Sequence, residues 1–296
     1  MLALVEIQDF LQKAGRGEID SSRLEPLIEQ FGEDCKAAMR KQFSSRDGYR
    51  IRMSGVGRPL CQQQLEKKGM KQDVGYNDIM RFLLGDLVEA VAIMVMKSVG
   101  VNIVDEQRKC TVKLAGQDIN GTLDVILDID GEEKVWDIKS ASPWSFANKF
   151  SGRGGYDAIK EDDPFGYIMQ GHLYGEAEGK PFGGWIVIDK SSGEWDFVEA
   201  PQDQSKDRET YLKDAHDRVD KLVTDAPFKV PFESVPETYT VKGQKIETGN
   251  RLLPKVCSFC SFKEHCWKNV EYAPKVTSRA KFKPNAWYTK IVKREL

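Results

Sequence analysis

The stretch from residue 121 to residue 139 constrains the fold more than any other part of this chain. Two runs rich in β-branched and apolar residues, Gly121-Thr-Leu-Asp-Val-Ile-Leu-Asp-Ile and Glu133-Lys-Val-Trp-Asp-Ile-Lys, lie on either side of Asp130-Gly131. An Asp-Gly pair between two such runs is a strong signal of a two-residue hairpin turn. The stretch therefore predicts two antiparallel strands that meet at residues 130 and 131.

Amphipathic patterns before and after this hairpin predict helices, and shorter apolar runs predict further strands. The expected helices cover 2–14, 22–43, 77–100, 164–178 and 204–223, with a short one at 143–149, and the other expected strands cover 111–114, 183–190 and 194–199. The order is helices, sheet, helix, sheet, helix, which predicts one α/β domain with helical and irregular additions.

Three segments follow from this order. Residues 1–76 are expected to form a helical amino-terminal region with a polar loop over 44–58, and residues 77–224 to form the core. Residues 225–296 are interrupted by prolines and are expected to be irregular, with a cysteine cluster and a basic tail.

The predicted hairpin would bring two carboxylates together. If Ile129 faces Glu132 across the turn, Asp124 lies opposite Asp137, with the side chains roughly 5 Å apart. Lys139 is two residues beyond Asp137 and projects from the same face of the strand. Carboxylate oxygens suit Mg²⁺ or Mn²⁺, so this trio is a candidate metal site. The alternative is a solvated sheet face with a compensating lysine.

Glu89 is a second candidate for that site. It precedes the apolar run Ala90 to Met96, so a carboxylate there is costly unless a cation or hydrogen bonds satisfy it. Gly85, one turn earlier on the same face, leaves room for another backbone or a ligand. The alternative for Glu89 is a salt bridge to a nearby lysine or arginine.

Three of the six cysteines form the array Cys257-x2-Cys260-x5-Cys266 in a polar segment, which favours a metal site over isolated buried thiols. A fourth ligand is needed, and Cys61 is the best candidate. Cys35 and Cys110 fall on an expected helix and strand, where small buried thiols are common. Zinc held by four cysteines, or with His265 in place of Cys61, fits the same spacing.

Four short motifs in order resemble those of the PD-(D/E)XK nuclease superfamily, and of its RecB-like branch most closely. They are Gly85-x3-Glu89, Gly121-Thr-Leu-Asp124, Trp136-Asp137-Ile138-Lys139 and Gln170-x3-Tyr174. The resemblance implies a restriction-endonuclease-like core, in which helices flank a mixed central sheet. It also implies that Glu89, Asp124, Asp137 and the carbonyl of Ile138 hold Mg²⁺ or Mn²⁺, that Lys139 is catalytic, and that Gln170 and Tyr174 line the path of DNA.

The cysteine pattern is similar to that of the iron–sulfur nucleases in this superfamily, namely the AddB-type helicase-nucleases and the CRISPR-adaptation exonucleases. This resemblance implies a [4Fe-4S] cluster held by Cys61, Cys257, Cys260 and Cys266. Spacing alone does not separate iron from zinc, so structural zinc stays open. A site that joins residue 61 to residue 257 is expected to be structural.

Composition requires that any DNA contact be local, because the formal net charge is only −2. Lys149 and Arg153 flank a glycine-rich loop that would clamp a strand near the metal, and Lys275 to Leu296 combine basic with aromatic residues. Packing of that tail by its own aromatics is the alternative. The longest apolar stretch, 90–96, is too short for a bilayer, and no secretory signal is evident, so we expect a location in the cytoplasm, or in that of a host cell if the chain is phage-encoded.

These observations together predict a Mg²⁺- or Mn²⁺-dependent deoxyribonuclease, an exonuclease acting on single strands or DNA ends in recombination, repair or phage DNA processing. Two other classes remain open. One is a nucleic-acid-binding module that keeps the fold without cutting, and the other is a zinc-stabilised interaction protein. No Gly-x4-Gly-Lys-Ser/Thr loop of a helicase motor is present in the sequence.

Overall fold

A computed structural model describes residues 2–44, 48–70 and 75–295. The chain divides into two compact units. The first unit holds Met1–Gly57 and Val74–Asp220, and the second holds Arg58–Asp73 and Lys221–Leu296. Each of the three expected segments is one continuous stretch of chain. Each unit instead combines two stretches, because residues 58–73 belong with the carboxy-terminal part. Among the described residues, no helix has the length and apolar character needed to cross a membrane.

A five-stranded sheet forms the centre of the first unit, in the order β1-β4-β5-β6-β7. Its strands are β1 Ile103–Glu106, β4 Val125–Ile129, β5 Glu132–Ala141, β6 Phe182–Asp189 and β7 Trp195–Glu199. The pair β5–β6 is parallel and the other three pairs are antiparallel. The predicted α/β class, with helices at the amino terminus and around a mixed sheet, is confirmed.

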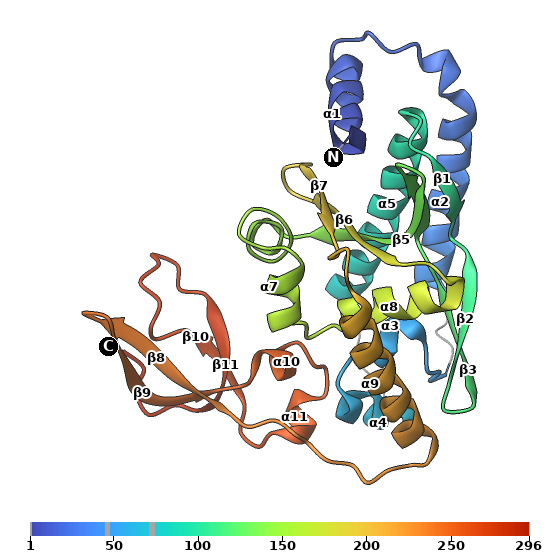
Figure 1. Cartoon of the computed structure of the whole chain (residues 1–296). Coiled ribbons are helices and arrows are strands. Elements are labelled where there is room, and N and C mark those ends of the chain that lie inside the picture. Colours follow the sequence, from blue (N-terminus) through green and yellow to red (C-terminus); the bar gives the residue numbers. More distant parts are fainter. Residues whose placement is uncertain (1, 45–47, 71–74, 296) are drawn as a thin grey trace. The chain divides into compact units, whose positions relative to one another are not determined.

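Along β4 and β5, which Figure 1 draws together with α5 and α8, successive side chains face opposite sides of the sheet. Leu127 and Ile138 pack in a cluster with Ile93 and Met96 of α5 (Tyr76–Ser98). Residues of the opposite parity, including Ile126 and Val135, pack in another cluster with residues of α8 (Tyr167–Glu178). The period of two thus directs Asp137 and Lys139 of β5 towards the α8 side of the sheet.

The predicted helices of the first unit are all present. Besides α5 and α8 they are α1 Leu2–Gly15, α2 Glu25–Phe43, α9 Ser205–Val223 and the short α6 Pro143–Ser145, which continues into a π-helical turn at Phe146–Phe150. Two short helices, α3 Met53–Val56 and α7 Tyr156–Glu161, were not expected. The first of them lies in the predicted loop over 44–58, of which residues 45–47 are outside the described part.

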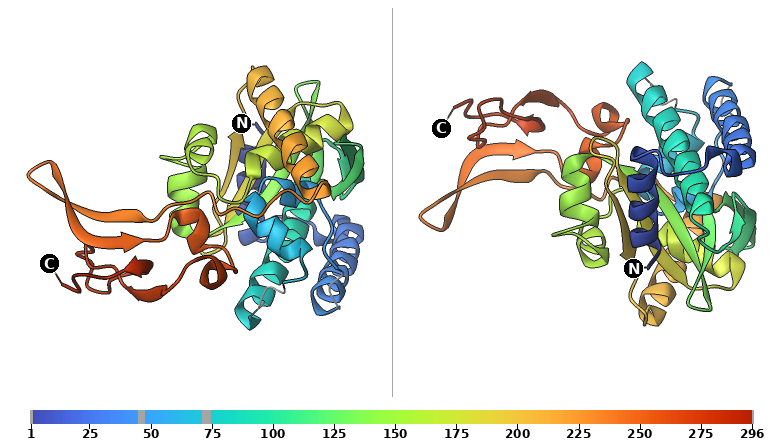
Figure 2. Two further views of the ribbon diagram at one scale, coloured as in Figure 1. Left: turned by 90° about the horizontal axis from the view of Figure 1, so that it is seen from below. Right: turned by 90° about the horizontal axis from the view of Figure 1, so that it is seen from above.

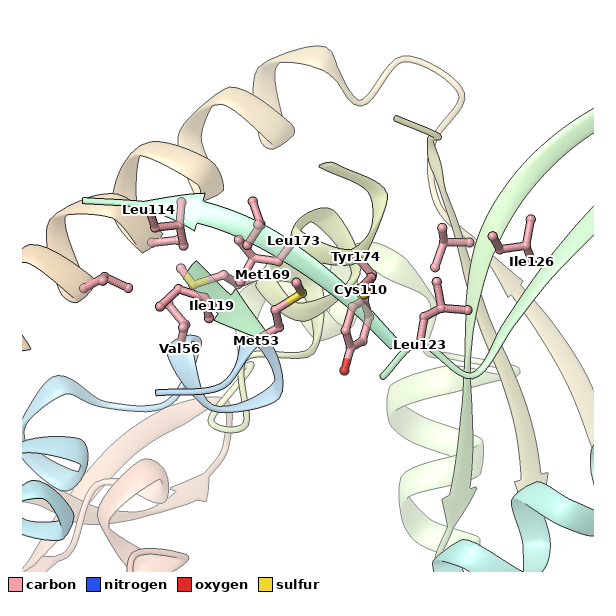
Figure 3. Packing of buried hydrophobic residues seen from close by; sticks show 14 residues of the cluster. Met53, Val56, Cys110, Leu114, Ile119, Leu123, Ile126, Met169, Leu173 and Tyr174 are labelled. Carbon is pink, nitrogen blue, oxygen red and sulfur yellow. The ribbon is translucent and has the colours of Figure 1, made fainter. Parts of the chain in front are cut away.

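The prediction of one continuous strand over 121–129 is wrong. The chain forms β3 (Gln117–Thr122), leaves strand geometry at Leu123 and Asp124, and resumes as β4. The break occurs because β3 pairs with β2 (Lys109–Leu114) as a separate two-stranded sheet, while β4 joins the central sheet. Met53, Cys110 and Leu173 are among the residues that pack in the cluster along this hairpin (Figure 3).

The second unit also differs from expectation, because residues 225–296 contain an antiparallel sheet rather than only irregular chain. Its order is β10-β11-β9-β8, with β8 Val235–Val241, β9 Gln244–Leu252, β10 Glu271–Pro274 and β11 Asn285–Lys290. Lys242 and Gly243, both with positive φ, close the β8–β9 hairpin drawn in orange in Figure 2. The same unit holds α4 (Leu60–Lys67), α10 (Lys255–Ser258) and α11 (Lys263–Cys266).

Candidate active site and cysteine site

The hairpin register that the candidate site requires is confirmed. Ile129 pairs with Glu132 and Val125 with Trp136, so the next position along the ladder sets Asp124 opposite Asp137. Asp130 and Gly131 have φ values of 56° and 83°, as a two-residue turn of this hand demands. The Asp130-Gly131 turn, which is recognisable in the sequence, therefore determines the register that sets Asp124 opposite Asp137.

Asp124 lies directly before β4, and its side chain reaches the backbone of β5. Its Oδ2 accepts a hydrogen bond from the backbone N–H of Ile138 at 2.7 Å. Burial raises the pKa of Asp124 well above its usual range, and the charges of Glu89 and Asp137 raise it further. Acidic side chains from two other elements are therefore close enough to disfavour the ionisation of Asp124.

Asp137 is only 2% exposed and faces α8. Gln170 Nε2 donates a hydrogen bond to its Oδ1 at 3.1 Å, and Lys139 Nζ lies 2.6 Å from its Oδ2. Among the described residues, that Oδ2 receives no hydrogen bond of normal geometry, so the lysine is its close counter-charge. A buried carboxylate oxygen of this kind needs a cation close by, and the Lys139 ammonium supplies that charge.

Lys139 stays charged in this environment. Burial alone lowers the pKa of its ammonium, but the charges of Asp137 and Asp124 outweigh that effect and raise the pKa above its usual range. The ammonium also lies 5.0 Å from the centroid of the Tyr167 ring.

Glu89 reaches the same group from α5. Burial raises its pKa, although a hydrogen bond from Gln107 and the charges of Lys41 and Lys139 act in the opposite direction. Gln107 donates its side-chain N–H to Glu89 Oε1, and its backbone N–H to the carbonyl oxygen of Asp124 at 2.9 Å. Gln107 thus ties Glu89 to Asp124, and nothing in the sequence pattern pointed to it.

The helix α8 contributes the residues of the fourth motif. Gln170 contacts Asp137, whereas the Tyr174 ring is 3% exposed and packs with Met53 in the core cluster (Figure 3). Burial raises the pKa of Tyr174, and the charges of Asp137 and Asp124 add to this rise. A Cβ atom at Gly121 would lie 2.5 Å from the Tyr174 ring, so the glycine of the second motif makes room for the tyrosine of the fourth.

Tyr167 is a site residue that sequence reasoning missed. It lies three residues before Gln170 and seven before Tyr174, so all three share one face of α8. That spacing was the available signal, and it identifies the face of the helix that is turned to Lys139.

The two basic residues expected near DNA differ from each other. Lys149 Nζ lies 2.9 Å from the Asp162 carboxylate and donates to the carbonyl oxygens of Ala158 and Asp162, at 3.1 and 3.3 Å. It therefore has a structural task within its loop. Arg153 is exposed on the same loop. DNA contact by either residue stays a prediction.

His172 of α8 contacts an aromatic group rather than these carboxylates. It is 1% exposed, stacks on Tyr211 at 5.6 Å, and has Nε2 3.2 Å from the Tyr156 hydroxyl. Burial lowers the pKa of His172 to about 4, so the ring is neutral at neutral pH and serves as a core residue.

The second unit brings its four predicted cysteine ligands to one place. Cys61, Cys257, Cys260 and Cys266 line a single small pocket together with Trp267. Burial, with a smaller effect of the neighbouring Cys266 and Cys260, raises the pKa of Cys61 to about 11. Cys35 on α2 and Cys110 on β2 belong to the first unit and have no part in this pocket.

Both sets have donors that suit a metal, but neither is arranged as a finished coordination sphere. Among the residues that the structure describes, no group of three or more His, Cys, Asp or Glu side chains is placed to hold a metal ion. In the carboxylate set, Lys139 and Gln107 occupy oxygens of Asp137 and Glu89. In the cysteine set, burial and mutual repulsion favour neutral thiols, and a bound metal would reverse that preference.

Comparisons with known proteins do not identify a family for this chain. No family model matches the chain, and no curated protein matches it. A solved structure described as "Crystal structure of SSO0001" is similar at 15% identity and a TM-score of 0.40, over 67% of this chain and 86% of that one. Similarity at that level carries no argument about this chain.

Proposed function

We propose that this chain is a metal-dependent deoxyribonuclease of the PD-(D/E)XK type, which hydrolyses phosphodiester bonds in single-stranded DNA or at DNA ends. The observation that carries the proposal is the meeting of three carboxylates with one amine. Glu89 from α5 and Asp137 from β5 both raise the pKa of Asp124, and Lys139 lies 2.6 Å from Asp137. Grouped acidic residues of perturbed pKa next to a lysine are typical of functional sites.

The donors present fit a hard divalent cation. Glu89, Asp124 and Asp137, with the carbonyl of Ile138, would hold Mg²⁺ or Mn²⁺ through oxygen. Such an ion supplies a coordinated water of lowered pKa and neutralises charge on the phosphate. For a metal ion to bind there, the Asp137 oxygen that faces Lys139 and the Glu89 oxygen that faces Gln107 would each have to contact the ion as well.

Lys139 acts in this proposal as a cation. The neighbouring aspartates hold the pKa of its amine above the usual range, which favours the protonated form. Its N–H groups would orient the attacking water or stabilise the phosphate oxygens in the transition state. The water oxygen bonds to phosphorus and gives up one proton, the bond to the leaving sugar oxygen breaks, and that oxygen takes up one proton.

The deciding test is digestion of end-labelled single- and double-stranded DNA with and without Mn²⁺. Asp124→Ala and Lys139→Ala should each reduce cleavage at least about a thousandfold, because they remove a ligand and the transition-state cation. Lys134→Ala is the matched control, since Lys134 lies on the same strand but pairs with Glu132. Normal cutting by both site variants would overturn the proposal, and DNA binding without cutting by the wild type would favour the non-cleaving module.

We propose further that Cys61, Cys257, Cys260 and Cys266 hold a [4Fe-4S] cluster with a structural role. Their shared pocket supports this, because the cluster would join residues 58–73 to the distant carboxy-terminal segment of the same unit. Cys257→Ala should yield insoluble or easily unfolded protein, whereas Cys110→Ala, at a buried cysteine of the first unit, should keep its metal. Brown protein that contains iron supports the cluster, and colourless protein that contains zinc would replace it with the zinc alternative.

A further inference from the structure

Two aromatic side chains form a small stack beside the candidate site, which we call the aromatic shelf. Phe165 and Tyr167 have ring centroids 5.4 Å apart and an interplanar angle of 28°. Tyr167 is half-buried, and its ring lies over the Lys139 ammonium at 5.0 Å. Phe165 is 40% exposed. The shelf therefore runs from solvent to the lysine.

The inner end of the shelf is supported by the core. Phe150 is 5% exposed, and its ring centroid lies 6.2 Å from that of Tyr167. The three rings thus follow one another from the interior to the surface. The Phe150 ring and the Lys139 ammonium both neighbour Tyr167, whereas Phe165, the outermost ring, keeps a substantial solvent-accessible area.

The backbone that presents the shelf is held firmly. The Asp163 carboxylate accepts hydrogen bonds from the N–H groups of Gly166 at 2.8 Å and Ile168 at 3.0 Å. Gly166 has a φ of 76°, and a Cβ atom there would lie 2.3 Å from the Cα of Gly57. This close contact and the positive φ both require glycine. The exposure of Phe165 is therefore built into a fixed turn.

We infer that the aromatic shelf stacks the unpaired nucleobase next to the phosphate that is cut, so that single-stranded DNA is the substrate class. This inference rests on the proposed function. A base in a duplex is already covered on both faces by its neighbours, whereas a base in a single strand offers a free face to an aromatic ring. Tyr167 contacts the amine that would stabilise the phosphate, so a base on the shelf would belong to an adjacent nucleotide.

Binding is tested first without cleavage. A fluorescent single-stranded oligonucleotide is titrated with full-length protein in Ca²⁺, and Phe165→Ala should bind about tenfold more weakly, equivalent to about 1.4 kcal/mol. Phe165→Tyr should bind like the wild type, because it keeps a ring. Phe43→Ala is the matched control, since Phe43 is a 64% exposed aromatic on α2 of the same unit. Equal affinity of the wild type and Phe165→Ala would overturn the inference.

Cleavage in Mn²⁺ then locates the base. Oligonucleotides with one abasic position should be cut about tenfold more slowly by the wild type when that position is next to the scissile phosphate, and Phe165→Ala should lose this discrimination. An abasic penalty that persists in Phe165→Ala would refute the shelf. If the wild type does not cut DNA but still binds it more tightly than Phe165→Ala does, the proposed function fails and the stacking surface stands. If the wild type cuts DNA and Phe165→Ala binds and cuts like the wild type, only the shelf fails.

Discussion

Two of the buried carboxylate sites among the described residues have opposite surroundings. Glu237 on β8 of the second unit is 1% exposed and is surrounded by donors. It accepts hydrogen bonds from the Tyr288 hydroxyl at 2.9 Å, Asn250 Nδ2 at 2.8 Å, and the N–H of Thr277 at 3.3 Å, besides two threonine hydroxyls. Burial raises the pKa of Glu237, but these hydrogen bonds outweigh it and the pKa is lowered.

Asp124 in the first unit has the reverse balance. Among the described residues it accepts a hydrogen bond from the Ile138 N–H, and the nearby carboxylates of Glu89 and Asp137 add to the effect of burial, so its pKa is raised. The chain is thus able to satisfy a buried carboxylate completely, and it does so where the carboxylate holds a sheet together. Where carboxylates are left short of donors and close to each other, their ionised form needs a cation.

The largest effect should come from disturbing the satisfied site. Glu237→Gln places an NH₂ group among donors, and we expect the free energy of unfolding of the second unit to fall by about 3 kcal/mol. Hydrogen exchange of the β8–β11 amides in rising urea measures it. Glu247→Gln, exposed on the neighbouring strand β9, is the control and should change little. A loss no greater than that of the control would show that the network adds no stability.

The pH dependence should have opposite signs at the two sites. The folded pKa of Glu237 is lowered, so its contribution to stability is complete above the unfolded value near 4.5 and disappears as pH falls through the folded pKa. The folded pKa of Asp124 is raised, so its unfavourable contribution begins as pH rises above the unfolded value near 3.8 and is complete above the folded pKa. Each slope approaches about 1.4 kcal/mol per pH unit at most.

Urea denaturation from pH 3 to pH 8 checks these signs. The free energy of unfolding of the wild type minus that of Glu237→Gln should rise with pH and level off above about 4.5, whereas that of the wild type minus that of Asp124→Asn should fall as the pH rises above about 4. Slopes of the same sign for both variants would contradict the assigned environments.

A smaller effect is expected when the crowded site loses one charge. Asp124→Asn keeps an oxygen for the Ile138 N–H and removes the repulsion with Glu89 and Asp137, so without divalent ions it should stabilise the first unit by about 1 kcal/mol while abolishing cleavage. Asp118→Asn, at an exposed position of β3, is the control for both the stability and the cleavage measurement. Destabilisation by Asp124→Asn would mean that the carboxylate is structural.

The parts of this site that were predictable from sequence depend on local chemistry. The Asp130-Gly131 turn fixes the register, and a period of two then determines which faces Asp137 and Lys139 share. The spacing of Cys257, Cys260 and Cys266 likewise signals a site before any fold is known.

What was missed depends on contacts between distant segments. Gln107 reaches Glu89 from a position with φ of 49°, which no pattern of apolar residues reveals. The break before β4 arises because the first part of one apolar run joins the β2–β3 sheet and the second part joins the central sheet. The sheet β8–β11 was hidden by prolines, which lie in its strands at Pro236 and Pro274, and by the polar residues of its exposed face.

The smallest predicted effect separates the two sites most directly. A divalent ion that binds only the folded carboxylate set stabilises the first unit by RT ln(1 + [ion]/Kd), about 0.4 kcal/mol when the concentration equals Kd. Thermal unfolding with Ca²⁺ or Mn²⁺ should show this rise in stability in the wild type. Glu237→Gln should show the same rise, because residue 237 lies outside the carboxylate set and is satisfied by hydrogen-bond donors. Asp124→Asn should show none. An equal rise in all three proteins would place the ion elsewhere, and the contrast between a satisfied and an unsatisfied carboxylate would lose its functional meaning.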